Sequence, residues 1–398
     1  GEIKEKDETE AVPTRTAVKM VDEIKTPLKT LPLKDRNWSW PVFILVLAYI
    51  LTMALLAINY STLSETGDRI GFLFGTFIVG MVAGLVFYNL GKWVFAKFAG
   101  YHLVYFVFTG LVWDKGRQKH WQLDSAQFLE FHSRFAPDND NLDADPRLML
   151  WGGLIAGLLL MAVGLVLGFV LTFPSVALKW AVVFGAAFSG TYLLYEILPV
   201  RQDYPSDAYA LSTVRDVDNR RAFNILYVNL ANMYADRDFA VPFFKDYGSY
   251  WKARTLIYVY LDQLYRADVE AAVKTLSLIQ TVAGYLNDSE KGLVAGERMF
   301  ILLLLKDRSG ADSLFIALPK ILKTEIVKPR SLPGYRSALL VASLILNRED
   351  TAIAATKGFA AALPAGAQST KIKQEKKYFA IALDKAREAN PNFALPQD

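Results

Sequence analysis

The pattern of hydrophobic and polar positions divides the chain into an apolar part and a charged part. Nearly all long runs without a charged residue fall between Trp40 and Leu198, and charged residues crowd on either side. A helix needs ~20 mainly apolar residues to cross the hydrocarbon core of a bilayer. We therefore expect four transmembrane helices, at about 41–60, 70–92, 148–173 and 177–198. The alternative is a set of core helices in a soluble protein, but four such runs so close together favour the membrane.

Basic residues near these runs predict the orientation of the chain, because they are enriched on the cytoplasmic side. They lie before the first expected span, between the second and third, and after the fourth: Lys25, Lys29, Lys34 and Arg36; Lys115, Arg117, Lys119, Arg134 and Arg147; Arg201, Arg215, Arg220 and Arg221. The other two connections carry Arg69 and Lys179, and Lys179 can reach the interface with its long side chain. We expect a multi-pass plasma-membrane protein with both termini in the cytoplasm.

Small residues recur at four-residue spacing within the expected spans. The pairs are Gly80 and Gly84, Gly153 and Gly157, and Gly164 and Gly168. This spacing lets two helix backbones approach closely. Glycine is common in membrane helices, so the pairs predict helix packing and not a specific site.

The charge pattern also predicts the domain organisation. We expect a cytoplasmic arm at 1–37, a membrane domain at 38–206 with a cytoplasmic insertion at 100–146, and a cytoplasmic helical domain at 207–398. Within the insertion, Tyr101 to Trp113 is aromatic and β-branched, which favours strands. The predicted fold class is an all-α membrane protein with four transmembrane helices, a small β-containing insertion and an α-solenoid-like cytoplasmic domain.

The C-terminal half shows apolar stripes at helical spacing, with water-facing charges between them. One stripe begins at Phe223, and further helices are expected at Tyr250–Tyr265, from Asp268, and at Ser289–Lys306, Asp312–Leu322, Gly334–Leu346, Asp350–Ala362 and Thr370–Ala389. The joints at Leu230–Phe239 and Tyr265–Ala272 resemble the turns of tetratricopeptide repeats, although their spacing departs from the ~34-residue standard. We expect a tetratricopeptide-like solenoid that binds protein or peptide, with a compact helical bundle as the alternative.

Composition narrows the possible chemistry. The formal net charge of +4 is too small to indicate nucleic-acid binding. The chain has no cysteine, which excludes disulfides, a thiol nucleophile and thiolate metal ligands. The three histidines, His102, His120 and His132, are not at ligand spacing, so we read them as solvated or packing residues and predict no cofactor.

The end of the second expected span carries a motif, Tyr88-Asn89-Leu90-Gly91-Lys92, followed by Phe-Ala-Lys-Phe-Ala-Gly-Tyr at 95–101. It resembles the signature of the site-2 protease family of intramembrane metalloproteases, His-Glu-Leu-Gly-His followed by Phe-Ala-Lys-x-x-Gly-Tyr. By this resemblance, Tyr88 and Lys92 stand where two zinc-binding histidines would be, and Asn89 replaces the glutamate base.

A second segment adds to the resemblance. Glu196-Ile197-Leu198-Pro199 is followed by Pro205-Ser206-Asp207-Ala208, similar to the Asn-x-x-Pro…Pro-x-Asp-Gly segment that carries the family's third ligand. The resemblance therefore implies that Asp207 stands at a ligand position, and it implies a β segment between the motifs. It covers roughly Ile70 to Tyr209 and implies a bacterial source.

The residue types argue against hydrolysis at this site. A catalytic zinc needs about three protein ligands and a water molecule, whereas Lys92 is a cation and Asn89 cannot accept a proton as a general base. We expect a degenerate protease site made of Tyr88, Asn89, Lys92 and Asp207, without metal and without catalytic residues. The hypothesis is that Lys92 replaces the zinc charge and pairs with Asp207, which hydrogen bonds from Tyr88 and Asn89 hold in place. The alternative is that Lys92 reaches lipid headgroups and Asp207 caps a helix.

These expectations lead to a functional hypothesis. The chain is expected to be a non-catalytic scaffold or regulatory subunit in the bilayer, which binds a membrane helix or peptide and a cytoplasmic protein within a hetero-complex. The alternatives are an active metalloprotease with an atypical site and a subunit of a membrane transporter.

Overall fold

The computed structural model describes residues 65–114, 121–123, 131–138, 141–199, 205–233, 237–241, 249–363 and 369–396, with scattered positions from 43 to 63. The expected arm at 1–37 lies outside the described residues, and the expected span at 41–60 lies largely outside them. The chain divides between Ala231 and Asn232 into two compact units. We call Lys34–Ala231 the apolar unit and Asn232–Asp398 the helical unit. This division lies at the C-terminal end of helix α8 (Val217–Asn232), later than the domain boundary expected at residue 207.

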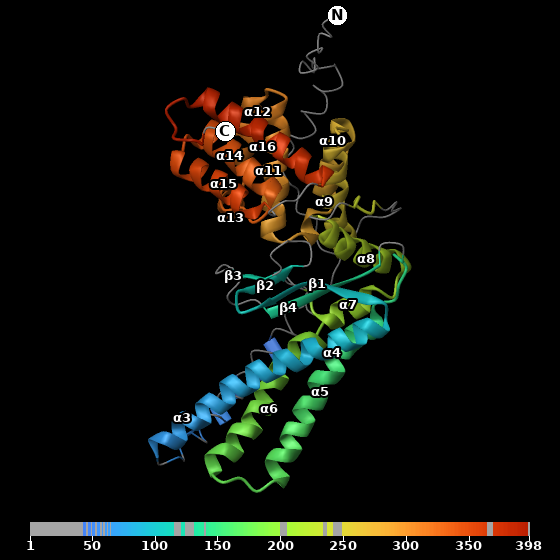
Figure 1. The fold of residues 1–398 in the computed structure, drawn as a ribbon, viewed down its shortest axis with the longest axis vertical. Coiled ribbons are helices and arrows are strands. Elements are labelled where there is room, and N and C mark those ends of the chain that lie inside the picture. The colour runs from blue at the N-terminus through green and yellow to red at the C-terminus, as the bar shows by residue number, and fades with distance from the viewer. Residues whose placement is uncertain are drawn as a thin grey trace, which may run out of the picture. The chain divides into compact units, whose positions relative to one another are not determined.

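The apolar unit contains a continuous helical stretch before the sheet and four helices after it (Figure 1). A nine-residue π-helix, η1, joins the two α-helical parts of the first stretch. The elements are α3 (Thr66–Phe74), η1 (Gly75–Ala83), α4 (Gly84–Phe98), α5 (Arg147–Val170), α6 (Val176–Ile197), α7 (Asp207–Thr213) and α8 (Val217–Asn232).

Helices α5 and α6 are long and apolar enough to cross a membrane, with 24 and 22 residues. They match the expected spans at 148–173 and 177–198, and Pro174 lies in the short connection between them. Ser175 caps α6 by accepting a hydrogen bond from the backbone N–H of Leu178 at 3.1 Å. Among the described residues, α5 and α6 are the only helices with the length and apolar composition needed to cross a membrane. The expected span at 70–92 is helical but divided by η1, so the four-span arrangement stays a prediction.

Small residues bring the helices of the apolar unit into close contact. A Cβ atom added to Gly80 would lie 2.7 Å from the carbonyl oxygen of Gly185 on α6. One added to Gly84 would lie 2.7 Å from the Cβ atom of Ser189, also on α6. Both distances are too short for real contacts, so the backbones are as close as glycine permits. The role expected for this pair is confirmed.

The insertion folds into a four-stranded antiparallel sheet in the order β3-β2-β1-β4, which confirms the expected strands. Strands β1 and β2 form a hairpin in which Phe108 pairs with Leu111. Its turn residues, Thr109 and Gly110, both have positive φ values, 46° and 78°. Positive φ at both central residues matches the twist of a two-residue hairpin. The strands are β1 (Tyr101–Phe108), β2 (Leu111–Asp114), β3 (Trp121–Leu123) and β4 (Phe131–Pro137).

The helical unit is built from short helices around one hydrophobic core. Most expected helices are present, and Tyr250–Tyr265 and Thr370–Ala389 match at both ends. The elements are α9 (Tyr250–Tyr265), α10 (Val269–Thr281), η3 (Ala283–Tyr285), α11 (Asp288–Leu304), α12 (Arg308–Ala317), α13 (Lys320–Val327), α14 (Leu332–Leu340), η4 (Val341–Leu346), α15 (Glu349–Ala362) and α16 (Thr370–Ala389).

The prediction of one continuous helix at Asp312–Leu322 is wrong. The chain leaves the helical conformation at Leu318, which is extended, and Pro319 then precedes a new helix. Proline lacks the backbone N–H that a continuing helix needs, and it disfavours the helical conformation of the preceding residue. The segment therefore forms two helices, α12 and α13.

Local hydrogen bonds fix the joints between helices. Asp268 accepts from the N–H of Ala271 at 3.1 Å and begins α10, as its expected capping role requires. Asn287 and Glu290 form a reciprocal capping box at the start of α11. Helices α9 and α10 pack together across the joint that resembles a tetratricopeptide turn. The solenoid itself stays a prediction.

Candidate functional site

The site residues of helix α4 lie on one face because Tyr88 and Lys92 are four positions apart. Both side chains are buried, and Asp207 is buried at the first position of α7. Ser206 fixes the start of α7, because its hydroxyl donates to the carbonyl oxygen of Leu198 at 2.6 Å and accepts from the N–H of Tyr209. The end of α6 thus positions Asp207 opposite α4.

Lys92 and Asp207 form a buried ion pair. The Nζ atom of Lys92 lies 2.6 Å from Oδ1 of Asp207. The hydroxyl of Tyr88 donates a hydrogen bond to the other carboxylate oxygen, Oδ2. The backbone N–H of Asp207 donates to Oε2 of Glu196 at 2.7 Å. The pairing expected from the sequence is therefore present, and each oxygen of the Asp207 carboxylate has a partner.

Asn89 does not have the role expected for it, which was to hold Asp207 by a hydrogen bond. Its Oδ1 accepts a hydrogen bond from the hydroxyl of Ser133 on β4 at 2.6 Å, and its Nδ2 donates to the carbonyl oxygen of Leu85 at 2.8 Å. Successive residues of a helix point ~100° apart, so Asn89 cannot share the face of its neighbour Tyr88. Asn89 joins α4 to the sheet instead of holding Asp207.

Glycines on α5 make room for the phenol ring of Tyr88. A Cβ atom added to Gly153 would lie 2.7 Å from the Cζ atom of Tyr88. One added to Gly157 would lie 3.5 Å from its Cδ2 atom. The pair that the spacing singled out thus forms a flat surface on α5, against which the ring packs.

The described histidines lie on strands of the sheet. His132 is on β4 and stacks on Tyr105, with 5.7 Å between the ring centroids. Burial, together with the charges of Arg134 and Lys92, lowers the pKa of His132 to about 2, so its imidazole is neutral at physiological pH. His102 lies 3.6 Å from Asp138 on the surface, and His120 lies outside the described residues.

The residues at this site do not fit a zinc ion. The ammonium group of Lys92 and the phenol of Tyr88 bind the two carboxylate oxygens of Asp207, which a zinc ion would need as ligands. Lys92 has no lone pair while it is charged, and it repels a cation. Among the described residues no group of three His, Cys, Asp or Glu side chains is placed to hold a metal. The arrangement holds α4, α6 and α7 together.

Sequence reasoning missed two contributions to the site. Ser133 had no motif around it, and only the fold of the sheet brings its hydroxyl to Asn89. Glu196 belongs to the second segment of the resemblance but was given no role there, and its carboxylate accepts a hydrogen bond from the backbone N–H of Asp207. A carboxylate is favourable near the N-terminus of a helix, where backbone N–H groups have no partner within the helix. The acidic type of residue 196 was the one signal in the sequence for this role.

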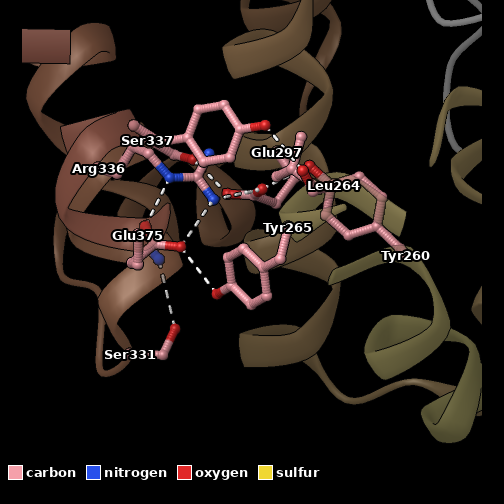
Figure 2. Close-up of polar contacts among 10 residues, drawn as sticks. Tyr260, Leu264, Tyr265, Glu297, Ser331, Arg336, Ser337 and Glu375 are labelled. Carbon is pink, nitrogen blue, oxygen red and sulfur yellow. Dashed lines mark hydrogen bonds and ion pairs between the residues drawn. The ribbon is translucent and has the colours of Figure 1, made fainter. Parts of the chain in front are cut away.

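A second polar cluster is buried inside the helical unit (Figure 2). The guanidinium of Arg336 lies between two carboxylates, with Nε 2.7 Å from Oε1 of Glu375 and Nη2 3.0 Å from Oε2 of Glu297. Tyr260 donates to Glu297 at 2.5 Å, and Tyr265 donates to Glu375 at 2.8 Å. Helices α9, α11, α14 and α16 thus meet at one ionic network.

Burial dominates the electrostatics of this cluster. It raises the pKa of Glu297, and the charge of Arg336 offsets only part of that rise. Burial and the Glu297 carboxylate raise the pKa of Tyr260. The guanidinium carbon of Arg336 also lies 3.8 Å from the ring centroid of Phe300, a cation–π contact. The side chains of Arg336, Glu297 and Glu375 are buried, and the network joins four helices of the unit.

The Lys92–Asp207 site joins α4, α6 and α7, and the Arg336 cluster joins four helices of the helical unit. No family model, curated protein or solved structure matches this chain.

Proposed function

We propose that this chain is a non-catalytic membrane scaffold or regulatory subunit, built on a fold like that of the site-2 proteases. It binds a membrane helix or peptide and, through its helical unit, a protein partner. The observation that carries the proposal is the 2.6 Å contact between Lys92 and Asp207, at the position where the resemblance implies a metal.

The chemistry of the pair supports a site that binds a partner and does not hydrolyse peptide bonds. A single ammonium group supplies the positive charge that the Asp207 carboxylate needs in a buried place. Tyr88 donates a hydrogen bond to the second oxygen of Asp207. These two contacts join α4 to α7, and no metal is needed for this. Asn89 is bonded to Ser133 and lacks a basic atom, so no general base is available at its position.

The surface of the apolar unit supports a location in the bilayer. Large apolar side chains are exposed along α5, where water would be an unfavourable neighbour: Trp151, Ile155, Leu158, Leu159, Val163, Val166, Phe169 and Val170. Similar side chains are exposed on α4: Val86, Phe87 and Leu90. Lipid is the solvent for such surfaces. We propose four spans with both termini in the cytoplasm of a bacterial cell, the first two spans being 41–60 and 70–92.

The helical unit supports a second binding partner. Its paired helices, and joints that resemble tetratricopeptide turns, are typical of domains that bind protein or peptide. A subunit with one binding surface in the membrane and another in the cytoplasm suits the regulation or escort of a larger membrane machine.

Metal analysis of the purified full-length chain tests the proposal. The wild-type protein is expected to carry no stoichiometric zinc. The Y88H/N89E/K92H variant restores two histidines at i and i+4 opposite Asp207, and it is expected to bind about one zinc ion per chain.

The matched control is V86H/L90H, which places two histidines at the same spacing on the exposed side of α4 and is expected to bind none. Stoichiometric zinc in the wild-type chain, or cleavage of a peptide by it, would overturn the proposal.

A further inference from the structure

The helical unit presents an apolar tip at the turn between α12 and α13. Ile316 is 74% exposed and Ile321 is 53% exposed. In the described part of this unit, Val241 is the one other large hydrophobic residue with comparable exposure. A single exposed isoleucine is ordinary, but here two exposed isoleucines flank one turn.

The exposure of these two side chains is not a consequence of poor packing. Leu318 in the turn is buried, and so are Leu322 and Ile326 of α13, which contact the core of the unit. Ile321 lies one position before Leu322, so it points ~100° away from that buried face. The fold therefore directs both isoleucines outward while their neighbours anchor the helices.

Basic residues outnumber acidic residues along this segment of the chain. Residues 316–330 contain Lys320, Lys323, Lys328 and Arg330 against the single acidic residue Glu325. The Nζ atom of Lys323 donates to the carbonyl oxygen of Ile316 at 3.0 Å and lies 5.3 Å from the ring centroid of Phe315. This contact closes the end of α12 and holds the tip in shape. We call residues 315–330 the α12–α13 tip.

We propose that the α12–α13 tip docks on the anionic headgroups of a phospholipid bilayer. Isoleucine side chains at this position can enter the boundary between headgroups and acyl chains, while the lysines and the arginine bind phosphate groups. The excess of positive charge complements an anionic lipid surface. The inference rests on the proposed membrane location of the chain, and it adds a second contact between the chain and the bilayer.

The absence of cysteine from the sequence makes a direct test possible. The I316C variant of the full chain, labelled with an environment-sensitive fluorophore, is placed in lipid nanodiscs that contain nitroxide-labelled lipid. Nitroxide quenching is expected to be several-fold stronger in discs with phosphatidylglycerol than in discs of phosphatidylcholine alone. The triple variant K320E/K328E/R330E is expected to abolish this difference.

The matched control is A360C, an exposed position on α15, which is expected to show weak quenching in both kinds of disc. Equal quenching at I316C and A360C in anionic discs would overturn the inference. So would a fluorophore that is shielded from water without lipid quenching, because this would indicate a protein partner or a second copy at the tip. Failure of the chain to enter discs at all would instead overturn the proposed membrane location.

Discussion

The ammonium nitrogen of Lys92 and the Oδ1 atom of Asp207 are 2.6 Å apart, although 115 positions separate the two residues in the sequence. The contact joins the middle of α4 to the first turn of α7. Because both side chains are buried, each charge depends on the other for its stability in the folded chain.

Removing one partner of this pair is expected to destabilise the apolar unit. K92A and D207A each leave an uncompensated buried charge, which costs about 3–5 kcal/mol of unfolding free energy. The double variant K92A/D207A is expected to lose less than the sum of the two single variants, because neither charge then remains. Denaturant titration of the protein in detergent measures the three losses.

The control for this series is K97A, which removes an exposed lysine of α4 that lies over Trp93. Its loss is expected to stay below about 1 kcal/mol. Additive losses in the double variant would show that Lys92 and Asp207 are not coupled.

The contact between Gly153 and the ring of Tyr88 predicts a steric effect. In G153A the new methyl group would lie 2.7 Å from Cζ of Tyr88, so the ring must move and its hydrogen bond to Asp207 is strained. We expect a loss of about 1–3 kcal/mol, measured by denaturant titration. G153A is expected to cost less in a Y88A background, where the ring is gone.

The matched control is G67A, since a Cβ atom there meets nothing within 4 Å. It is expected to be neutral or slightly stabilising, because alanine favours helix. A neutral G153A would contradict the close packing of α4 on α5.

Arg336 is expected to be essential for the stability of the helical unit. R336M leaves two buried carboxylates without a cation and should cost about 3–5 kcal/mol. R336K keeps the charge, but it lacks the planar fork that reaches both Glu297 and Glu375, so we expect an intermediate loss. Thermal unfolding followed by circular dichroism ranks the variants, and R330M on the surface should stay within about 0.5 kcal/mol of wild type.

Glu297 is expected to make stability depend on pH. Burial raises its pKa in the folded chain, so its favourable contribution is complete below the pKa of the unfolded chain and is lost as pH rises through the folded pKa. The unfolding midpoint of the wild type should therefore fall relative to that of E297Q as the pH rises above the ordinary range of a carboxyl group.

The control for the pH series is E270Q, which alters an exposed pair with Lys274 and is expected to keep the wild-type dependence. Parallel curves for wild type and E297Q would show that the carboxyl group of Glu297 does not titrate differently in the folded chain.

Much of the local structure was predictable from the sequence because it depends on local chemistry. The period of apolar residues predicted the helix at Tyr250–Tyr265, and β-branched and aromatic residues predicted the strands after Tyr101. The four-residue spacing of Tyr88 and Lys92 placed both on one face of a helix. Pro319 also indicated the end of a helix, although the predicted helix Asp312–Leu322 continued through it.

Contacts between distant segments were decided by the tertiary structure alone. Asn89 turns to Ser133 because the sheet folds back over α4, and no local pattern predicts this contact. Arg336 meets two glutamates that lie 39 positions before and after it, on separate helices. Periodicity determines which face of a helix is apolar, but the packing of several helices determines which polar groups meet inside. The sequence thus determined most of the elements and, in the candidate site, the positions of Tyr88, Lys92 and Asp207. The fold decided the partners of Asn89 and Glu196.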